Sequence, residues 1–154
     1  MKSVHVLLDE YGDSHQNPIN KFIHWVCVPL IVLSLLGLLW SVPFPGGDLS
    51  TQPFNWVTLL LLGAVFYYFL LSWRLAAGMI VFSCTLYIIL LWLDDFLISL
   101  WLLSLIIFTV AWIGQFIGHY IEGKRPSFFK DIQFMLIGPL WLLATVYRKL
   151  KLPY

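Results

Sequence analysis

Residues 17–42 read NPINKFIHWVCVPLIVLSLLGLLWSV, and this stretch decides the fold. Asn17 can cap the free N–H groups at a helix start, and Pro18 fits the first helical position, where its missing N–H costs nothing. The side chains that follow are apolar on every side, and no charge occurs after Lys21. The run exceeds the roughly 20 residues that a helix needs to cross a bilayer core. We therefore predict a membrane-spanning helix with a kink at Pro29.

The rest of the 154-residue chain has the same character. Hydrophobic residues make up 60% and charged residues 11%, whereas a soluble domain is about half apolar and about a quarter charged. We predict a single all-α, multi-pass membrane domain over residues 1–154, and the absence of a basic run argues against nucleic acid as a partner. The predicted spans cover residues 18–42, 55–73, 75–93 and 96–121, and a shorter apolar segment, interrupted at Gly138-Pro139, covers residues 131–147.

The nine Lys and Arg residues predict the orientation, because such residues gather on the cytoplasmic side. All nine share one face if four helices cross and the last apolar segment enters and leaves on the same side. We therefore predict four transmembrane helices plus a re-entrant or interfacial helical hairpin broken at Gly138-Pro139; five crossings are the alternative. Both termini are then cytoplasmic, in a bacterial inner membrane or the endoplasmic reticulum. Within the cytoplasmic segment 1–17 we predict a short amphipathic surface helix, with apolar positions at Val4, Leu7, Leu8 and Tyr11.

This topology brings the start of the first span and the end of the fourth to the same side of the membrane. His15 precedes the first helix, His24 lies within it, and His119 lies at the end of the fourth. Polar residues in spans are costly and usually face the bundle interior, so they are functional candidates. Imidazoles with a carboxylate or waters suit Fe, Zn, Cu or Ni. We predict catalytic roles for His15, His24, His119 and Glu122, with the three histidines as metal ligands.

Further polar residues lie on the same helix faces as His24 and His119. Asn20 lies four residues before His24, and Gln115 lies four residues before His119, so each pair shares one helix face. Glu122 could bind the metal or hold His119 in the correct tautomer. A simpler alternative is that the histidines make interhelical hydrogen bonds or lie among lipid headgroups; three on one side favour the metal. We predict roles in substrate binding or ligand support for Asn20, Gln115, Lys21 and Arg125.

Two motifs carry a family resemblance that runs over nearly the whole chain. The first is His15-x-Asn17-Pro18-x-Asn20-x-x-x-His24-x-x-x-Val28-Pro29, and the second is Gln115-Phe116-x-Gly118-His119, followed by Glu122, Arg125-Pro126 and Asp131. With these motifs the chain resembles the small membrane proteins related to the fungal endoplasmic-reticulum 2-hydroxy fatty acid dioxygenase.

The resemblance implies an enzyme of fatty acid α-oxidation with Fe(2+) as its cofactor. In this reaction a 2-hydroxy fatty acid and O2 give the fatty acid that is one carbon shorter, CO2 and water. The α-hydroxy carboxylate can chelate iron through two oxygens, and oxidative decarboxylation supplies the electrons that O2 requires. The acyl tail would lie among the apolar spans, next to membrane lipid.

Two other functions fit the same residues. The first is a different lipid-acting metalloenzyme, such as a zinc hydrolase. The second is a non-catalytic small membrane scaffold or transporter subunit, although a transporter more often places its polar groups near the middle of the membrane. The sequence leaves the oligomeric state open.

Overall fold

The computed structural model describes residues 2–45, 54–96, 99–126 and 133–154, and these residues contain α-helices and no strand. The predicted all-α class is therefore confirmed. In chain order the helices are α1 (Val4–Gly12), α2 (Pro18–Trp40), α3 (Trp56–Leu71), α4 (Trp73–Phe96), α5 (Leu100–Glu122) and α6 (Phe134–Lys149).

Three of these helices, α2, α4 and α5, are long and apolar enough to cross a membrane. The predicted span 55–73 is instead the shorter apolar helix α3, with 16 residues. At a rise of about 1.5 Å per residue, α3 is shorter than the roughly 30 Å hydrocarbon core. The structure thus fits a membrane protein with three candidate spans and one shorter apolar helix. The other predicted spans each lie within a few residues of α2, α4 or α5.

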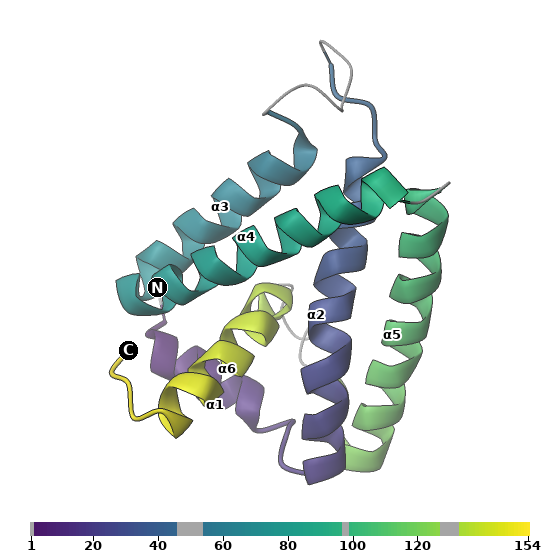
Figure 1. The fold of residues 1–154 in the computed structure, drawn as a ribbon. Helices are drawn as coiled ribbons and strands as arrows, with labels where there is room; N and C mark the ends of the chain where they lie inside the picture. The colour runs from purple at the N-terminus through teal and green to yellow at the C-terminus, as the bar shows by residue number, and fades with distance from the viewer. Residues whose placement is uncertain (1, 46–53, 97–98, 127–132) are drawn as a thin grey trace.

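Helices α2 and α5 lie side by side and run in opposite directions (Figure 1), so the start of α2 meets the end of α5. Two glycines of α5 permit this close approach. A Cβ atom on Gly118 would collide with the Asn20 side chain, and one on Gly114 would lie 2.8 Å from Cys27 Sγ. The Gly114-x-x-x-Gly118 spacing therefore brings the two helices together, as small residues do in membrane helix pairs.

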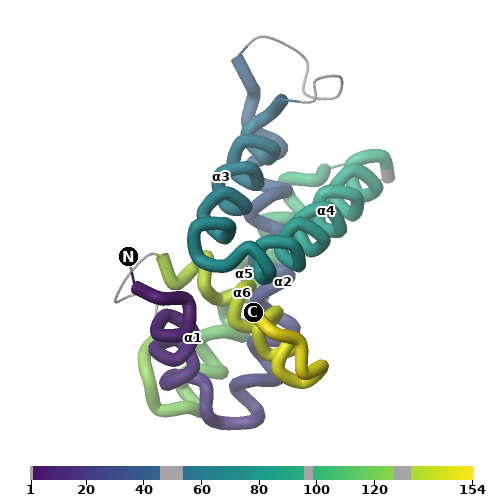
Figure 2. The backbone as a smooth tube through the Cα atoms, turned by 90° about the vertical axis from the view of Figure 1, so that its left-hand side faces the viewer, coloured from purple at the N-terminus to yellow at the C-terminus, as the bar shows by residue number. Residues whose placement is uncertain are grey.

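Helix α1 packs against α6, and the two lie together in the lower part of the view in Figure 2. The apolar positions predicted for the amphipathic helix are those that are buried, namely Val4, Leu7, Leu8 and Tyr11. They pack in one cluster with residues of α6, including Ile137 and Leu140. The helix is confirmed, but its predicted place on the membrane surface is not, because its apolar face packs against α6.

The predicted hairpin at Gly138-Pro139 is wrong, because α6 is one helix from Phe134 to Lys149. Pro139 removes a single backbone hydrogen bond to the fourth residue before it. Ile137, Gly138, Pro139 and Leu140 are all buried, and this packing against neighbouring helices offsets the loss. Residues 131–132 of the predicted segment, and with them Asp131 of the second motif, lie outside the described residues.

Gly118→Leu should destabilise the fold by forcing α2 and α5 apart at Asn20. Overpacking of this kind costs about 1–3 kcal/mol, so the thermal unfolding midpoint of the detergent-solubilised protein should fall. Gly63→Leu is the matched control, because Gly63 on α3 is exposed and an added Cβ meets nothing within 4 Å. Equal midpoints for the two variants would contradict the proposed role of Gly118.

Candidate metal centre

Three histidines from separate segments meet in the interior. His15 lies in the turn after α1, His24 lies in α2, and His119 lies in the last turn of α5. One ring nitrogen from each histidine can serve as a ligand, and these three nitrogens lie within 4.8 Å of one another. The relative exposures are 0%, 1% and 5%, so the cluster is shielded from solvent. The structure thus brings together the three residues that the sequence proposed as ligands.

The hydrogen bonds of His15 and His24 fix which ring nitrogens carry protons. His15 Nδ1 donates to the carbonyl oxygen of Tyr11 at 2.6 Å, and His24 Nδ1 donates to that of Asn20 at 3.0 Å. A carbonyl oxygen can only accept, so in each neutral ring Nε2 holds a bare lone pair. Metal-binding histidines are commonly oriented by such a bond from the other nitrogen.

The two bare nitrogens face each other, with His15 Nε2 lying 2.8 Å from His24 Nε2. Burial lowers the pKa of His15 to about 4, so this ring is neutral near pH 7 and does not supply a proton to the contact. Two lone pairs at such a distance repel unless a positive charge lies beside both. The pair is therefore arranged to share a cation.

His119 completes the cluster. Its ring centroid lies 5.1 Å from that of His15 and 5.0 Å from that of His24. Its buried Nδ1 has no hydrogen-bond partner among the described residues, and an unsatisfied buried nitrogen costs about 1–3 kcal/mol. Gly123, with φ of 71°, ends α5 in the left-handed conformation directly after this turn. A metal ion is one ligand that would satisfy the third ring.

Glu122 joins the segments that carry the histidines. One carboxylate oxygen accepts the backbone N–H of Gln16 at 2.8 Å, and the other accepts that of Asn17 at 2.9 Å. The Asn20 side-chain amide also donates to Glu122, at 3.0 Å. The carboxylate is not part of the close group of ligand atoms. In this structure it clamps the end of α5 to the His15 turn and the start of α2.

The remaining predicted site residues divide between the interior and the surface. Asn20 is buried and donates to the carbonyl oxygen of Ser14 as well as to Glu122. Gln115 is buried and faces a cavity beside His24 and His119. Lys21 lines a separate, open cavity on the His15 side, and Arg125 is exposed.

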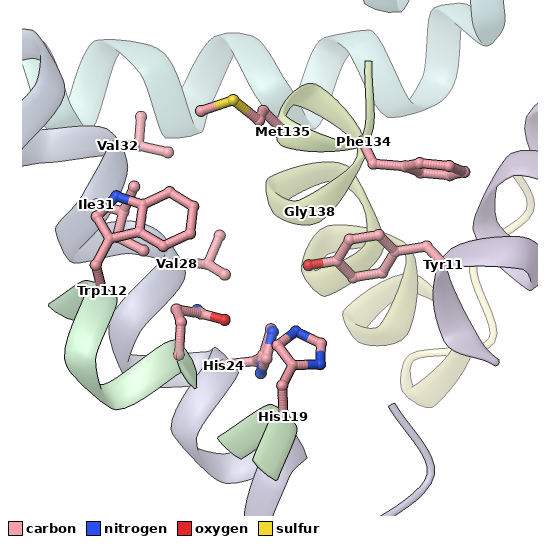
Figure 3. A pocket seen from close by; sticks show the side chains of 11 residues that line it. Tyr11, His24, Val28, Ile31, Val32, Trp112, His119, Phe134, Met135 and Gly138 are labelled. Carbon is pink, nitrogen blue, oxygen red and sulfur yellow. The ribbon is translucent and has the colours of Figure 1, made fainter. Parts of the chain in front are cut away.

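A cavity of about 60 Å³ lies between α2, α5, α6 and α1. Figure 3 shows His24 and His119 at one end and Val32 and Met135 at the other. The walls between them are mostly apolar, and they include Val28, Ile31, Trp112 and Phe134. The histidine cluster therefore adjoins an apolar chamber, with few polar groups beside it.

Tyr11 lines the cavity, although the sequence did not predict it as a site residue. Its apolar helical spacing assigned it to the covered face of α1, and it is indeed buried. Its hydroxyl nevertheless points into the cavity (Figure 3). The available signal was its place four residues before His15, which lets the Tyr11 carbonyl orient that ring.

His24→Ala and His119→Ala should each abolish stoichiometric metal binding, because the buried cluster would lose one of its three ligands. Elemental analysis of the purified variants measures this directly. His5→Ala is the control, since His5 packs against Tyr154, with ring centroids 5.5 Å apart, rather than against the cluster. Full metal content in His24→Ala would contradict the ligand assignment.

Glu122→Gln should weaken metal binding without abolishing it. The amide keeps the shape of the carboxylate but places a donor where the acid accepts backbone N–H groups. Loss of such supporting contacts typically costs about 10–100-fold in metal affinity, which chelator competition can measure. The control is Glu10→Gln, because Glu10 forms an exposed ion pair with Lys2. Unchanged affinity would exclude the clamp as a determinant of the site.

Comparison with known proteins supports the family resemblance over nearly the whole chain. The family described as 2-hydroxy-palmitic acid dioxygenase Mpo1-like matches residues 1–150, which include both motifs and all four histidines. A Saccharomyces cerevisiae protein named 2-hydroxy-palmitic acid dioxygenase MPO1 is 29% identical over 143 residues, which cover 91% of this chain and 77% of that protein. No solved structure matches. The chain belongs to the Mpo1-like family.

Proposed function

We propose that this protein is an Fe(2+)-dependent dioxygenase of 2-hydroxy fatty acids. The reaction converts a 2-hydroxy fatty acid and O2 into the fatty acid that is one carbon shorter, CO2 and water. The observation that carries the proposal is the position of three buried imidazoles at the end of an apolar cavity. Membership of the Mpo1-like family supports the reaction class.

The donor set fits a divalent transition metal. Imidazole nitrogens suit iron, zinc, copper and nickel, and a site with three protein ligands leaves positions open for substrate and O2. Iron, when bound, would supply the activation of O2 and the polarisation of the α-hydroxy acid. His15, His24 and His119 would hold it, with the rings of His15 and His24 oriented by backbone carbonyls.

The residues around the cluster have separate roles in this proposal. Glu122 and Asn20 hold the His15 turn against the ends of α2 and α5. Gln115 presents a side-chain amide to the cavity, where it can donate to a substrate carboxylate. Lys21 and Arg125 attract the anionic head as it approaches the site. In our proposed topology the site and both termini lie on the cytoplasmic side of the membrane.

The apolar cavity would hold the part of the acyl tail that is nearest the head. Its walls bury methylene groups from water, and each buried CH2 contributes about 0.8 kcal/mol. The polar head then lies at the histidine end, and the tail extends toward Val32 and Met135 (Figure 3). In this proposal the histidines would hold the metal next to the α-carbon, and the apolar walls would keep bulk water away from it.

The direct test is turnover by the purified protein. With Fe(2+), O2 and 2-hydroxypalmitate, the wild-type protein should form pentadecanoate and CO2, as measured by mass spectrometry. His24→Ala and His119→Ala should be inactive, whereas His5→Ala should remain active. Absence of product from iron-loaded wild-type protein would overturn the proposal.

Val32→Trp should shift the preference toward shorter 2-hydroxy acids by filling the cavity end away from the histidines. Each methylene that can no longer be buried should reduce kcat/KM by about 4-fold, which corresponds to about 0.8 kcal/mol. Comparison of 2-hydroxy acids of different lengths measures the shift. Val81→Trp on α4 is the control, because Val81 is 67% exposed and does not line the cavity.

A zinc hydrolase acting on lipid is the second candidate, because three imidazoles and an open position also suit catalytic zinc. The two proposals differ in the metal retained on purification and in oxygen uptake. Zinc as the native metal, together with ester hydrolysis and no O2 consumption, would favour the hydrolase.

A further inference from the structure

The Tyr11 ring is fixed in place by other rings. It stacks on His15, with centroids 4.3 Å apart and planes 12° apart. The rings of Trp141 and Phe134 lie against it at centroid distances of 5.7 and 6.2 Å. The side chain is only 7% exposed. The direction of its hydroxyl is therefore set by the packing of α1 against α6.

That hydroxyl points into the cavity and lies next to Gly138 (Figure 3). A Cβ atom on Gly138 would lie 3.0 Å from the hydroxyl oxygen. Among the described residues, none forms a hydrogen bond with this hydroxyl. Tyr68 offers a contrast, because its buried hydroxyl donates to the Leu136 carbonyl oxygen at 2.8 Å. Since a buried tyrosine hydroxyl usually has a partner, that of Tyr11 is placed to meet a ligand.

Gln115 supplies a second, independent sign of a ligand. It lines the same cavity and is 5% exposed, and its Nε2 has no hydrogen-bond partner in the described part of the chain. Most other side chains of the wall are apolar. The Tyr11 hydroxyl and the Gln115 amide therefore face one largely apolar cavity that His24 and His119 also line, so a ligand there can meet two polar groups.

The chemistry of the two groups assigns one function to each. A side-chain amide N–H donates, which suits a carboxylate, because a carboxylate can only accept. A phenol hydroxyl both donates and accepts, which suits an alcohol with the same two capacities. The ligand class that matches both is a hydroxy carboxylic acid, which under the proposed function is a 2-hydroxy acid.

We infer that Tyr11 is a specificity-determining residue whose hydroxyl hydrogen-bonds to the 2-hydroxyl group of the substrate, while Gly138 keeps the space it needs. The inference rests on the proposed function and adds the group that separates a 2-hydroxy fatty acid from a plain one. An acid without the hydroxyl leaves the buried phenol unpaired, and sites built to bond a hydroxyl reject such analogues strongly.

The experiment measures equilibrium binding of 2-hydroxypalmitate and of palmitate to the metal-loaded, full-length protein without O2. Tyr11→Phe removes the hydroxyl and keeps the ring that stacks on His15. The variant should bind 2-hydroxypalmitate about 10-fold more weakly and palmitate at least as well as wild type. Its metal content should be unchanged, because the Tyr11 carbonyl, and not its side chain, orients His15.

Two further variants separate recognition from structure. Gly138→Ala adds a methyl group against the Tyr11 hydroxyl and should weaken 2-hydroxypalmitate binding in the same selective way. Tyr68→Phe is the matched control: it removes a buried hydroxyl that joins α3 to α6. This control should lower the unfolding midpoint and leave the preference between the two acids unchanged.

The outcomes distinguish failure of this inference from failure of the proposed function. If Tyr11→Phe keeps the wild-type preference, or weakens both acids equally, the inference is overturned and the dioxygenase proposal stands. If wild-type protein neither binds nor consumes 2-hydroxypalmitate, the proposed function itself fails, and the inference fails with it.

Discussion

The contact of Asn20 with Gly118 is the constraint on which the site depends. Because residue 118 has no side chain, the Asn20 amide fits between α2 and α5 and reaches Glu122. The close approach of the two helices places the rings of His24 and His119 next to each other. The same close approach lets the Glu122 carboxylate accept the N–H groups of the turn after His15. A larger residue at position 118 would separate two histidines and loosen the third.

The cluster places polar groups where an apolar fold tolerates them poorly. Two imidazoles are oriented by backbone carbonyls so that their lone pairs converge, and the third has an unsatisfied nitrogen. Such an arrangement is unfavourable in a buried setting when nothing positive lies beside it. The packing of α1, α2, α5 and α6 must therefore supply the free energy that holds the rings together. Strain of this kind is expected where a fold is built for a ligand rather than for stability alone.

Sequence reasoning predicted the helices and the meeting of the histidines well, because apolar run length and charge placement depend on local composition. The predicted topology brought His15, His24 and His119 to one side of the membrane, although no contact between them could be predicted. The prediction was wrong where packing against other helices determines the local structure. Pro139 breaks an isolated helix, yet here its surroundings are packed on α1 and other helices. The direction of the Tyr11 hydroxyl also could not be predicted, because helical spacing assigns a side chain to a helix face but does not determine which atoms its terminal group contacts.

The location of the cluster within the bundle favours an amphiphilic substrate over a small polar one. The histidines lie at the ends of α2 and α5, close to the open cavity lined by Lys21 and charged residues of α1 and α6. The apolar cavity leads away from them along α2, from His24 past Val28 to Val32. In helices that cross a membrane, this direction runs from the interface toward the hydrocarbon core. A lipid with its head at the interface therefore matches the cavity in polarity and in direction, whereas a water-soluble substrate would leave the apolar walls without a function.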